Sequence, residues 1–260
     1  MWRLALNFYQ EPNALLSEKQ TIFIFGRKSE VSWSWPYFFD YMINGLMLRG
    51  VWVTIWLSII SMVLGLGLGI LAALMKMYGN RLLRYIAEFY IWLFRGTPIL
   101  IQLVIIYTGL PQLGIRFTVI ESCILGLALN EGAYLAEIIR AGIMSVDKGQ
   151  EDASRAVGMN WRERMWFVIL PQATRTIIPP LGNQFNGMLK TTSLCSVISM
   201  QELMRSAQMI AQIEFRVLEA YCIAALWYLL LVSIWGLIQA RIEAHYEKPF
   251  GSEEAAVSDK

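Results

Sequence analysis

A long apolar run constrains this chain more than any other feature of its sequence. The run from Val51 to Leu74 contains no charged residue. A helix rises about 1.5 Å per residue, so about 20 apolar residues cross the hydrocarbon layer of a bilayer. The whole chain agrees with a membrane location. Of its 260 residues 56% are hydrophobic and 16% are charged, with a mean hydropathy of +0.46, which is too apolar for a typical soluble domain.

Four further segments have the length and composition of membrane spans. They cover residues 85–106, 119–139, 177–194 and 218–238. The second span is interrupted by Arg95-Gly96-Thr97-Pro98, where Pro98 either kinks the helix or opens a backbone break that lines a cavity. The sequence therefore predicts an all-α membrane protein with about five transmembrane helices.

The distribution of Lys and Arg predicts the orientation of these spans. Basic residues crowd the first and third connections, whereas the other two connections hold only Arg116, Arg205 and Arg216. Basic loops favour the cytosol, so the amino terminus is expected outside and the carboxyl terminus inside. Basic residues before the first span, with Arg49 beside it, oppose this orientation. We expect an extracytoplasmic extension with an interfacial aromatic segment (1–45), a transmembrane domain (46–245) with a cytosolic loop (145–171), and a cytosolic tail (246–260).

Several classes of function are excluded by what the sequence lacks. A net charge of +2 without a basic tract does not predict a nucleic-acid partner. Three scattered cysteines and one histidine predict neither a disulfide framework nor a metal site, and we expect no cofactor. No Lys follows a Gly, and neither HExxH nor GxSxG occurs, so the chain is not expected to be an enzyme. The glycines Gly65, Gly67 and Gly69 lie inside an apolar span, where close helix packing is their expected role.

The loop of residues 145–171 contains ordered helix boundaries. Acidic residues open a helix from Gln150 to Val157, and Gly158 suits the left-handed residue that closes it. Asn160 with Glu163 predicts a capping box, and the following helix is expected to kink or end at Pro171. The sequence therefore predicts a short rigid helix facing the cytosol, against the alternative of an ordinary solvated loop.

The same loop resembles the EAA loop of bacterial ATP-binding-cassette importers. That family's pattern is Glu-Ala-Ala, a Gly four residues after the last Ala, and a terminal hydrophobic-x-Leu-Pro. Here the matching residues are Asp152, Ala153, Ser154 and Gly158, followed by Val168-Ile169-Leu170-Pro171. Asp, Ser and Val stand where the family usually has Glu, the second Ala and Ile.

Further segments resemble the polar amino-acid permeases of this class, the histidine, glutamine and arginine permease-like branch. They are Phe94-Arg95-Gly96-Thr97-Pro98 with Gln102, residues 130–142 (NEGAYLAEIIRAG), Leu170-Pro171-Gln172-Ala173, and Lys190-Thr191-Thr192-Ser193-Leu194. The likeness extends over about residues 50–242. It leaves the amino-terminal extension and the tail unmatched.

This resemblance implies the type I importer permease fold and a subunit that transports a polar or charged amino acid across the bacterial cytoplasmic membrane. It implies a separate ATP-binding cassette subunit that docks on the loop, an extracytoplasmic amino-acid-binding protein, and a second permease subunit, identical or similar. Membrane lipid is the remaining partner. A secondary transporter or channel component is the alternative class, and it would not need such a loop.

Polar residues inside the spans are candidates for a substrate pathway, because polar groups in hydrocarbon are costly and tend to face a cavity or a partner. Glu137 could equally form an ion pair with Arg140. Glu131 could face the substrate, but an internal pair with Lys190 is favoured. The full candidate set is Thr97, Gln102, Asn130, Glu131, Tyr134, Glu137, Asn183, Asn186 and Lys190.

Overall fold

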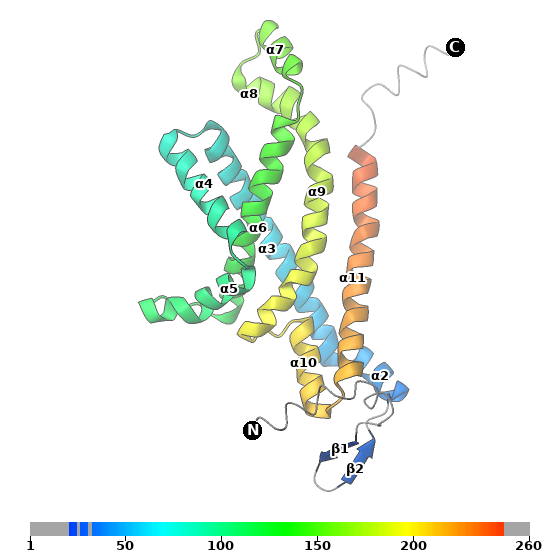
Figure 1. The fold of residues 1–260 in the computed structure, drawn as a ribbon. Coiled ribbons are helices and arrows are strands. Elements are labelled where there is room, and N and C mark those ends of the chain that lie inside the picture. The colour runs from blue at the N-terminus through cyan, green and yellow to red at the C-terminus, as the bar shows by residue number, and fades with distance from the viewer. Residues whose placement is uncertain (1–20, 25–26, 31–32, 247–260) are drawn as a thin grey trace, which may run out of the picture.

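Long helices running in roughly one direction form the body of the molecule. The computed structural model describes residues 21–24, 27–30 and 33–246. Its longest helices are α3 (Gly45–Tyr78), α6 (Val119–Met144), α9 (Leu170–Thr191) and α11 (Val217–Tyr246). They lie lengthwise beside one another, with α6 between α4 (Arg81–Gly96) and α9 (Figure 1). The predicted all-α fold is confirmed.

The predicted second span is bent at Pro98. Helix α4 ends at Gly96, and the next helical stretch runs from Ile99 to Leu113 at an angle of 104° to it. That stretch consists of α5 (Ile99–Val104), the π-helical turn η2 (Ile105–Gly109) and the 3-10 turn η3 (Leu110–Leu113). Thr97 is extended, with φ −119° and ψ 146°, as the residue before a proline usually is.

Fewer helices are long and apolar enough to cross a membrane than the five spans that the sequence predicts. In the described part of the chain α3, α6 and α11 are long and apolar enough to cross a membrane, and the bent pair brings the number to four if counted as one span. Helix α9 has 22 residues, which is long enough, but it is the most polar of the predicted spans and does not meet the criterion.

Helices α3 and α6 pack closely because small residues lie between them. A Cβ added at Gly69 would lie 2.8 Å from the Cβ of Leu135, and one at Gly65 would lie 3.1 Å from the Cβ of Glu131. Gly67 differs, because nothing lies within 4 Å of its added Cβ. Close helix packing, the expected role of these glycines, is therefore confirmed at Gly65 and Gly69.

One end of the molecule carries the amino-terminal segments. Strands β1 (Thr21–Ile24) and β2 (Arg27–Glu30) form an antiparallel hairpin that the sequence does not predict. The aromatic segment forms helix α2 (Trp35–Met42), which lies beside α10 (Leu203–Glu214) and the start of α11. The Tyr41 hydroxyl donates to Glu214 Oε1 at 2.8 Å, and Trp227 Nε1 donates to the Met42 carbonyl at 2.9 Å.

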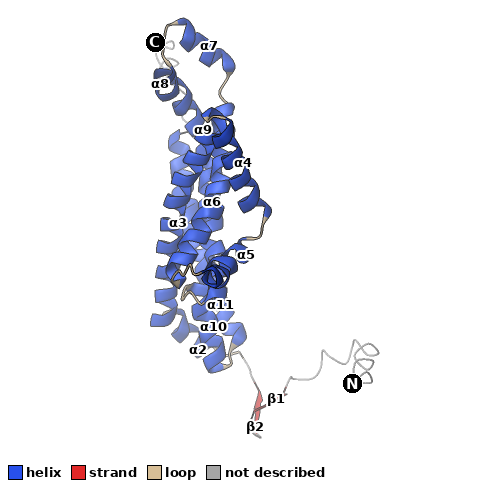
Figure 2. Ribbon diagram, turned by 90° about the vertical axis from the view of Figure 1, so that its left-hand side faces the viewer, coloured by secondary structure: helices blue, strands red, loops and turns tan. Residues whose placement is uncertain are grey.

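The opposite end carries the loop that the sequence singles out (Figures 1 and 2). It consists of α7 (Lys148–Ala156), α8 (Trp161–Glu163) and the π-helical turn η4 (Arg164–Ile169), which leads into α9. At its other end α9 continues as the 3-10 helix η5 (Thr192–Ile198) before α10. The predicted loop and the amino-terminal segments thus lie at opposite ends of the molecule.

Candidate functional site

Helix α7 has a fixed amino-terminal end. The Asp147 side chain caps it, since its Oδ1 accepts a hydrogen bond from the Gly149 N–H at 2.6 Å. Glu151 lies in the first turn, where a carboxylate interacts favourably with the helix dipole, and it pairs with Arg155 at 2.6 Å. The predicted helix starts at Gln150, whereas α7 starts two residues earlier, at Lys148, because Asp147 caps it.

The carboxyl-terminal end of α7 is fixed by Gly158. Its φ is +83°, so the left-handed conformation predicted for this glycine is confirmed. The Gly158 N–H donates to the Arg155 carbonyl at 2.9 Å, and the Met159 N–H donates to the Ser154 carbonyl at 3.1 Å. These two bonds define a Schellman motif, which satisfies carbonyls that a helix end otherwise leaves free.

The three residues that resemble the EAA motif are not equally accessible. Asp152 and Ala153 are exposed, whereas Ser154 is only 5% exposed. The Ser154 hydroxyl donates to the Glu151 carbonyl at 2.7 Å, inside the helix. A partner approaching α7 from outside would therefore meet Asp152 and Ala153, while Ser154 packs against the rest of the loop.

The second part of the loop contains the predicted capping box. The Glu163 N–H donates to Asn160 Oδ1 at 3.1 Å, and the Asn160 N–H donates to Glu163 Oε2 at 2.8 Å. Only the three residues of α8 are α-helical before the π-helical turn begins. Leu170 is the first residue of α9 and Pro171 lies in its first turn, where a missing amide hydrogen costs least. The preceding π-helical turn thus ends just before Pro171, which lies in the first turn of α9.

The base of the loop is attached to α3 and α6. The ring of Trp161 lies edge-on to that of Tyr78 at 5.3 Å, at the end of α3. A cavity of about 230 Å³ lies beside this contact, and its lining includes Asp147, Glu151 and Arg164. Below it a hydrophobic cluster joins Ala73, Ile139, Ile143 and Ala173, which come from α3, α6 and α9. The loop therefore rests on three helices at once.

Three of the predicted pathway residues form a network that holds the bend at Pro98. The Gln102 side-chain amide donates to the Phe94 carbonyl at 3.0 Å, and to the carbonyl and hydroxyl of Thr97 at 3.1 and 2.8 Å. Asn130 Nδ2 of α6 donates to the same Phe94 carbonyl at 2.9 Å and to Gln102 Oε1 at 3.1 Å. Proline removes a helical donor, so these amides satisfy a carbonyl that the bend leaves free.

Two further predicted residues follow Asn130 along the same face of α6. The Tyr134 ring lies 5.3 Å from the guanidinium carbon of Arg95. Glu137 pairs with Lys76 of α3 at 2.7 Å and with Arg140 at 2.9 Å, so the ion pair considered for it is present. Arg95 is absent from the predicted site. The signal that could have found it is a charged residue inside the second span, three residues before Pro98.

Glu131 has a different partner from the one the sequence favours. Its side chain is 7% exposed, and its Oε1 accepts a hydrogen bond from Gln184 Nε2 of α9 at 3.0 Å. Lys190 is exposed and lies in a groove with Ser193 and Tyr228, against α11. The expected Glu131–Lys190 pair is therefore wrong. Lys190 lies six residues, well over one helical turn, beyond Gln184, and Gln184 occupies the α9 position that faces Glu131.

The remaining α9 candidates do not join the α6 face. Asn183 accepts a hydrogen bond from Gln239 of α11 at 3.2 Å. The Oδ1 of Asn186 is buried without a hydrogen-bond partner. The structure thus brings Thr97, Gln102, Asn130 and Tyr134 together around Phe94 and Arg95, and leaves Asn183, Asn186 and Lys190 on another side of the bundle.

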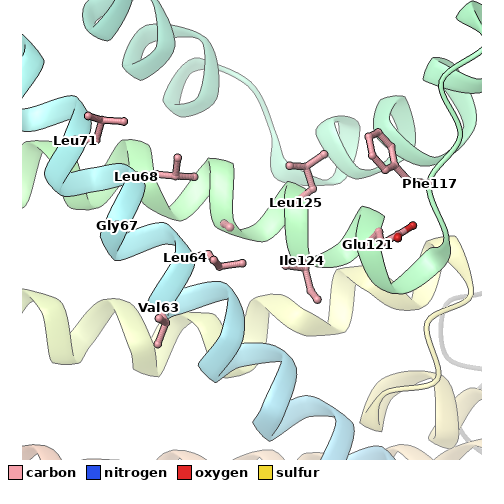
Figure 3. Close-up of a pocket in the computed structure, with 10 residues that line it drawn as sticks. Val63, Leu64, Gly67, Leu68, Leu71, Phe117, Glu121, Ile124 and Leu125 are labelled. Atoms are coloured by element: carbon pink, nitrogen blue, oxygen red, sulfur yellow. The ribbon is translucent and has the colours of Figure 1, made fainter.

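A groove of about 610 Å³ between α3 and α6 contains none of the predicted residues. Figure 3 shows Leu64, Leu68, Ile124 and Leu125 projecting from the two helices into it. Glu121 is its one charged lining residue, and its carboxylate accepts from the Thr118 N–H at 2.7 Å in the capping box of α6. Among the described residues, no group of three or more His, Cys, Asp or Glu side chains is placed to hold a metal ion.

Comparison with known proteins assigns the chain to a family. Residues 65–248 match the family described as binding-protein-dependent transport system inner membrane component. An arginine transport system permease protein of Corynebacterium glutamicum is 39% identical over 87% of this chain and 76% of the relative. A glutamine transport system permease protein of Escherichia coli is 36% identical over 76% of this chain and 91% of the relative.

A solved structure extends this similarity to the fold. The crystal structure of an amino acid ABC transporter with histidines superimposes with a TM-score of 0.78 at 36% identity, and covers 82% of this chain and 99% of that chain. The chain belongs to the family of binding-protein-dependent transport system inner membrane components.

Proposed function

We propose that this chain is the permease subunit of an ATP-driven importer for a polar or charged amino acid, and that its α7 loop receives the ATPase subunit. The observation that carries the proposal is the geometry of α7. This helix is fixed at one end by the Asp147 cap and at the other by the left-handed Gly158, and it presents Asp152 and Ala153 outward. A rigid exposed helix of this kind is suited to binding a partner protein. Leu170 and Pro171 fix where the loop returns to α9.

The position of the loop supports a coupling role. Ala73, Ile139, Ile143 and Ala173 form one cluster beneath it, so a displacement of the loop acts on α3, α6 and α9 together. A packed interior transmits such a displacement because it has little free volume. Nucleotide can drive transport only if it favours one state of the permease over the other, and the docked loop is the contact that would differ between states.

The substrate class is proposed from the relatives and from the polar helices. The two relatives above are described as transporting arginine and glutamine, one charged and one polar amino acid. The candidate pathway follows Thr97, Gln102, Asn130, Tyr134 and Glu137. Glu131 lies on another side of α6, and Asn183, Asn186 and Lys190 lie on α9. Polar groups at these depths favour an aqueous path or a partner subunit.

The proposed assembly contains a permease dimer, two ATPase subunits and an extracytoplasmic binding protein. The second permease subunit is another copy of this chain or a similar chain. The amino terminus and the 1–45 extension would face the outside, where the binding protein delivers substrate, and the 246–260 tail would face the cytosol. The distribution of basic residues supports this orientation.

A reconstituted uptake assay tests the proposed function. The chain is purified with its ATPase, inserted into proteoliposomes, and supplied with the binding protein and with labelled L-arginine, L-glutamine, L-histidine or L-leucine. We expect uptake of at least one polar or charged amino acid, little uptake of leucine, and none without the binding protein. Uptake that an ion gradient alone can drive, in vesicles lacking the ATPase, would instead support a secondary transporter or channel.

A further inference from the structure

One face of α6 carries polar residues along a transmembrane helix. Asn130, Tyr134, Glu137 and Arg140 follow one another at intervals of four, three and three residues, which places them on a single side. Each of them contacts a group on α3, α4 or α6 itself. Asn130 donates a hydrogen bond to the Phe94 carbonyl, and the Tyr134 ring lies against the guanidinium of Arg95. Glu137 forms ion pairs with Lys76 and Arg140.

The charges on this face do not balance. Lys76 and Arg140 share the single carboxylate of Glu137, at 2.7 and 2.9 Å. Among the described residues no carboxylate pairs with Arg95, whose guanidinium lies over the Tyr134 ring. Three cations therefore face one anion. Unpaired charge is costly at membrane depth, so this face favours an additional anion or water.

Arg95 is held in position by the network around the bend. The carbonyl of its neighbour Phe94 accepts hydrogen bonds from both Gln102 and Asn130, which fixes the end of α4 against α6. The guanidinium then lies over an aromatic ring, while Arg95 is exposed and Tyr134 is 38% exposed. A guanidinium supported in this way keeps its planar fork of N–H donors available, and that fork matches the two oxygens of a carboxylate.

We propose that Arg95, held over Tyr134, binds the α-carboxylate of the amino-acid substrate as it passes α6. The proposal rests on the proposed function, since it names the group that recognises the substrate there. It also changes the role of three predicted pathway residues: Thr97, Gln102 and Asn130 position Arg95 through the backbone of Phe94. These are positioning residues, and Arg95 is the residue that touches the substrate.

The test compares amino acids with their α-carboxamides, which differ only in the group that Arg95 would bind. The purified permease–ATPase complex, without binding protein, is titrated with L-arginine, L-argininamide, L-glutamine and L-glutaminamide, and the shift of its thermal midpoint gives an apparent Kd. For the wild type we expect at least one acid to bind about tenfold or more tightly than its amide, the loss that follows removal of a charge-assisted hydrogen bond.

The variants separate recognition from structure. Arg95→Gln should weaken binding of the acid to the level of the amide and leave the amide unchanged, whereas Arg95→Lys should retain a preference for the acid. Arg84→Gln is the matched control, because it removes the same charge from an exposed position on the same helix and should preserve the preference. Among the described residues, the cation–π contacts involve Arg95 and Arg216 and not Arg84. If Arg95 only supports the fold, acid and amide will weaken together.

Two outcomes would overturn the proposal. One is a wild-type complex that does not distinguish acid from amide, and the other is an Arg95→Gln variant that keeps the distinction. The second would be expected if Arg95 pairs with a lipid phosphate or with a carboxylate of a second copy. Failure of the proposed function is recognised separately, because wild-type proteoliposomes would then take up no amino acid with ATP and binding protein.

Discussion

Gly158 determines where the helix that faces the proposed ATPase ends. Its φ of +83° lies in the left-handed region, which a β-branched residue reaches only at a cost of about 1–2 kcal/mol. The Schellman bonds from Gly158 and Met159 depend on that conformation. No side chain would obstruct a Cβ at this position, because nothing lies within 4 Å of it, so any effect of substitution acts through the backbone.

We therefore expect Gly158→Val to abolish ATP-driven uptake while the chain still inserts into the membrane. The altered turn would displace α7 and weaken recovery of the ATPase subunit during purification. Gly158→Asn is the control, since Asn adopts the left-handed conformation far more readily and should retain most of the uptake. Normal ATPase recovery with substrate-stimulated hydrolysis in the Val variant would refute the role proposed for this turn.

Glu131 and Gln184 give a second prediction at the residue scale. Gln184→Leu removes the hydrogen bond that Gln184 donates to the carboxylate of Glu131, which is 7% exposed. Leaving a buried polar group without its partner lowers the free energy of unfolding by about 1–3 kcal/mol. The thermal midpoint of the purified complex should fall. Lys190→Met, on the exposed side of the same helix, should change it little. A Lys190 variant destabilised as much as the Gln184 variant would favour the Glu131–Lys190 pair instead.

At the scale of elements, the contact between α3 and α6 gives a direct test of packing. Gly69→Ala would place a Cβ 2.8 Å from the Cβ of Leu135 and 3.2 Å from backbone atoms of α6. Overpacking of this kind typically costs about 1–3 kcal/mol. Gly67→Ala, two residues earlier, meets nothing within 4 Å and gains helix propensity. Thermal unfolding of the two purified variants should show a lower midpoint for Gly69→Ala only. Equal midpoints would contradict the close contact.

Elements with strong local signals could be predicted from the sequence, and elements set by tertiary contacts could not. Apolar length predicts α3, α6 and α11, and the capping residues Asn160 and Glu163 predict the start of α8. The 104° direction of α5 could not be predicted, because it depends on amides of Gln102 and Asn130 that reach Phe94 only in the folded chain. The partner of Glu131 was missed for a similar reason, since helix rotation decides which α9 residue faces it.

At the scale of the whole molecule, the loop and the amino-terminal segments lie at opposite ends (Figure 1). Labelling with a membrane-impermeant thiol reagent would establish the orientation in a variant lacking Cys123, Cys195 and Cys222. Val157→Cys is the suitable probe because Val157 is 74% exposed, whereas Ser154, in the same loop, is only 5% exposed. We expect labelling only after the membrane is permeabilised, with Ser29→Cys labelled in intact cells. The reverse pattern would place the loop outside.

Hydrolysis of ATP by a docked subunit is the event proposed to drive transport through this chain. The most direct test measures ATP hydrolysed and labelled amino acid accumulated in the same proteoliposomes, which contain the wild-type complex and are supplied with binding protein. We expect accumulation with ATP, none with a non-hydrolysable analogue, and hydrolysis stimulated by the loaded binding protein. Equal accumulation with the analogue, or accumulation by the permease chain alone, would contradict it.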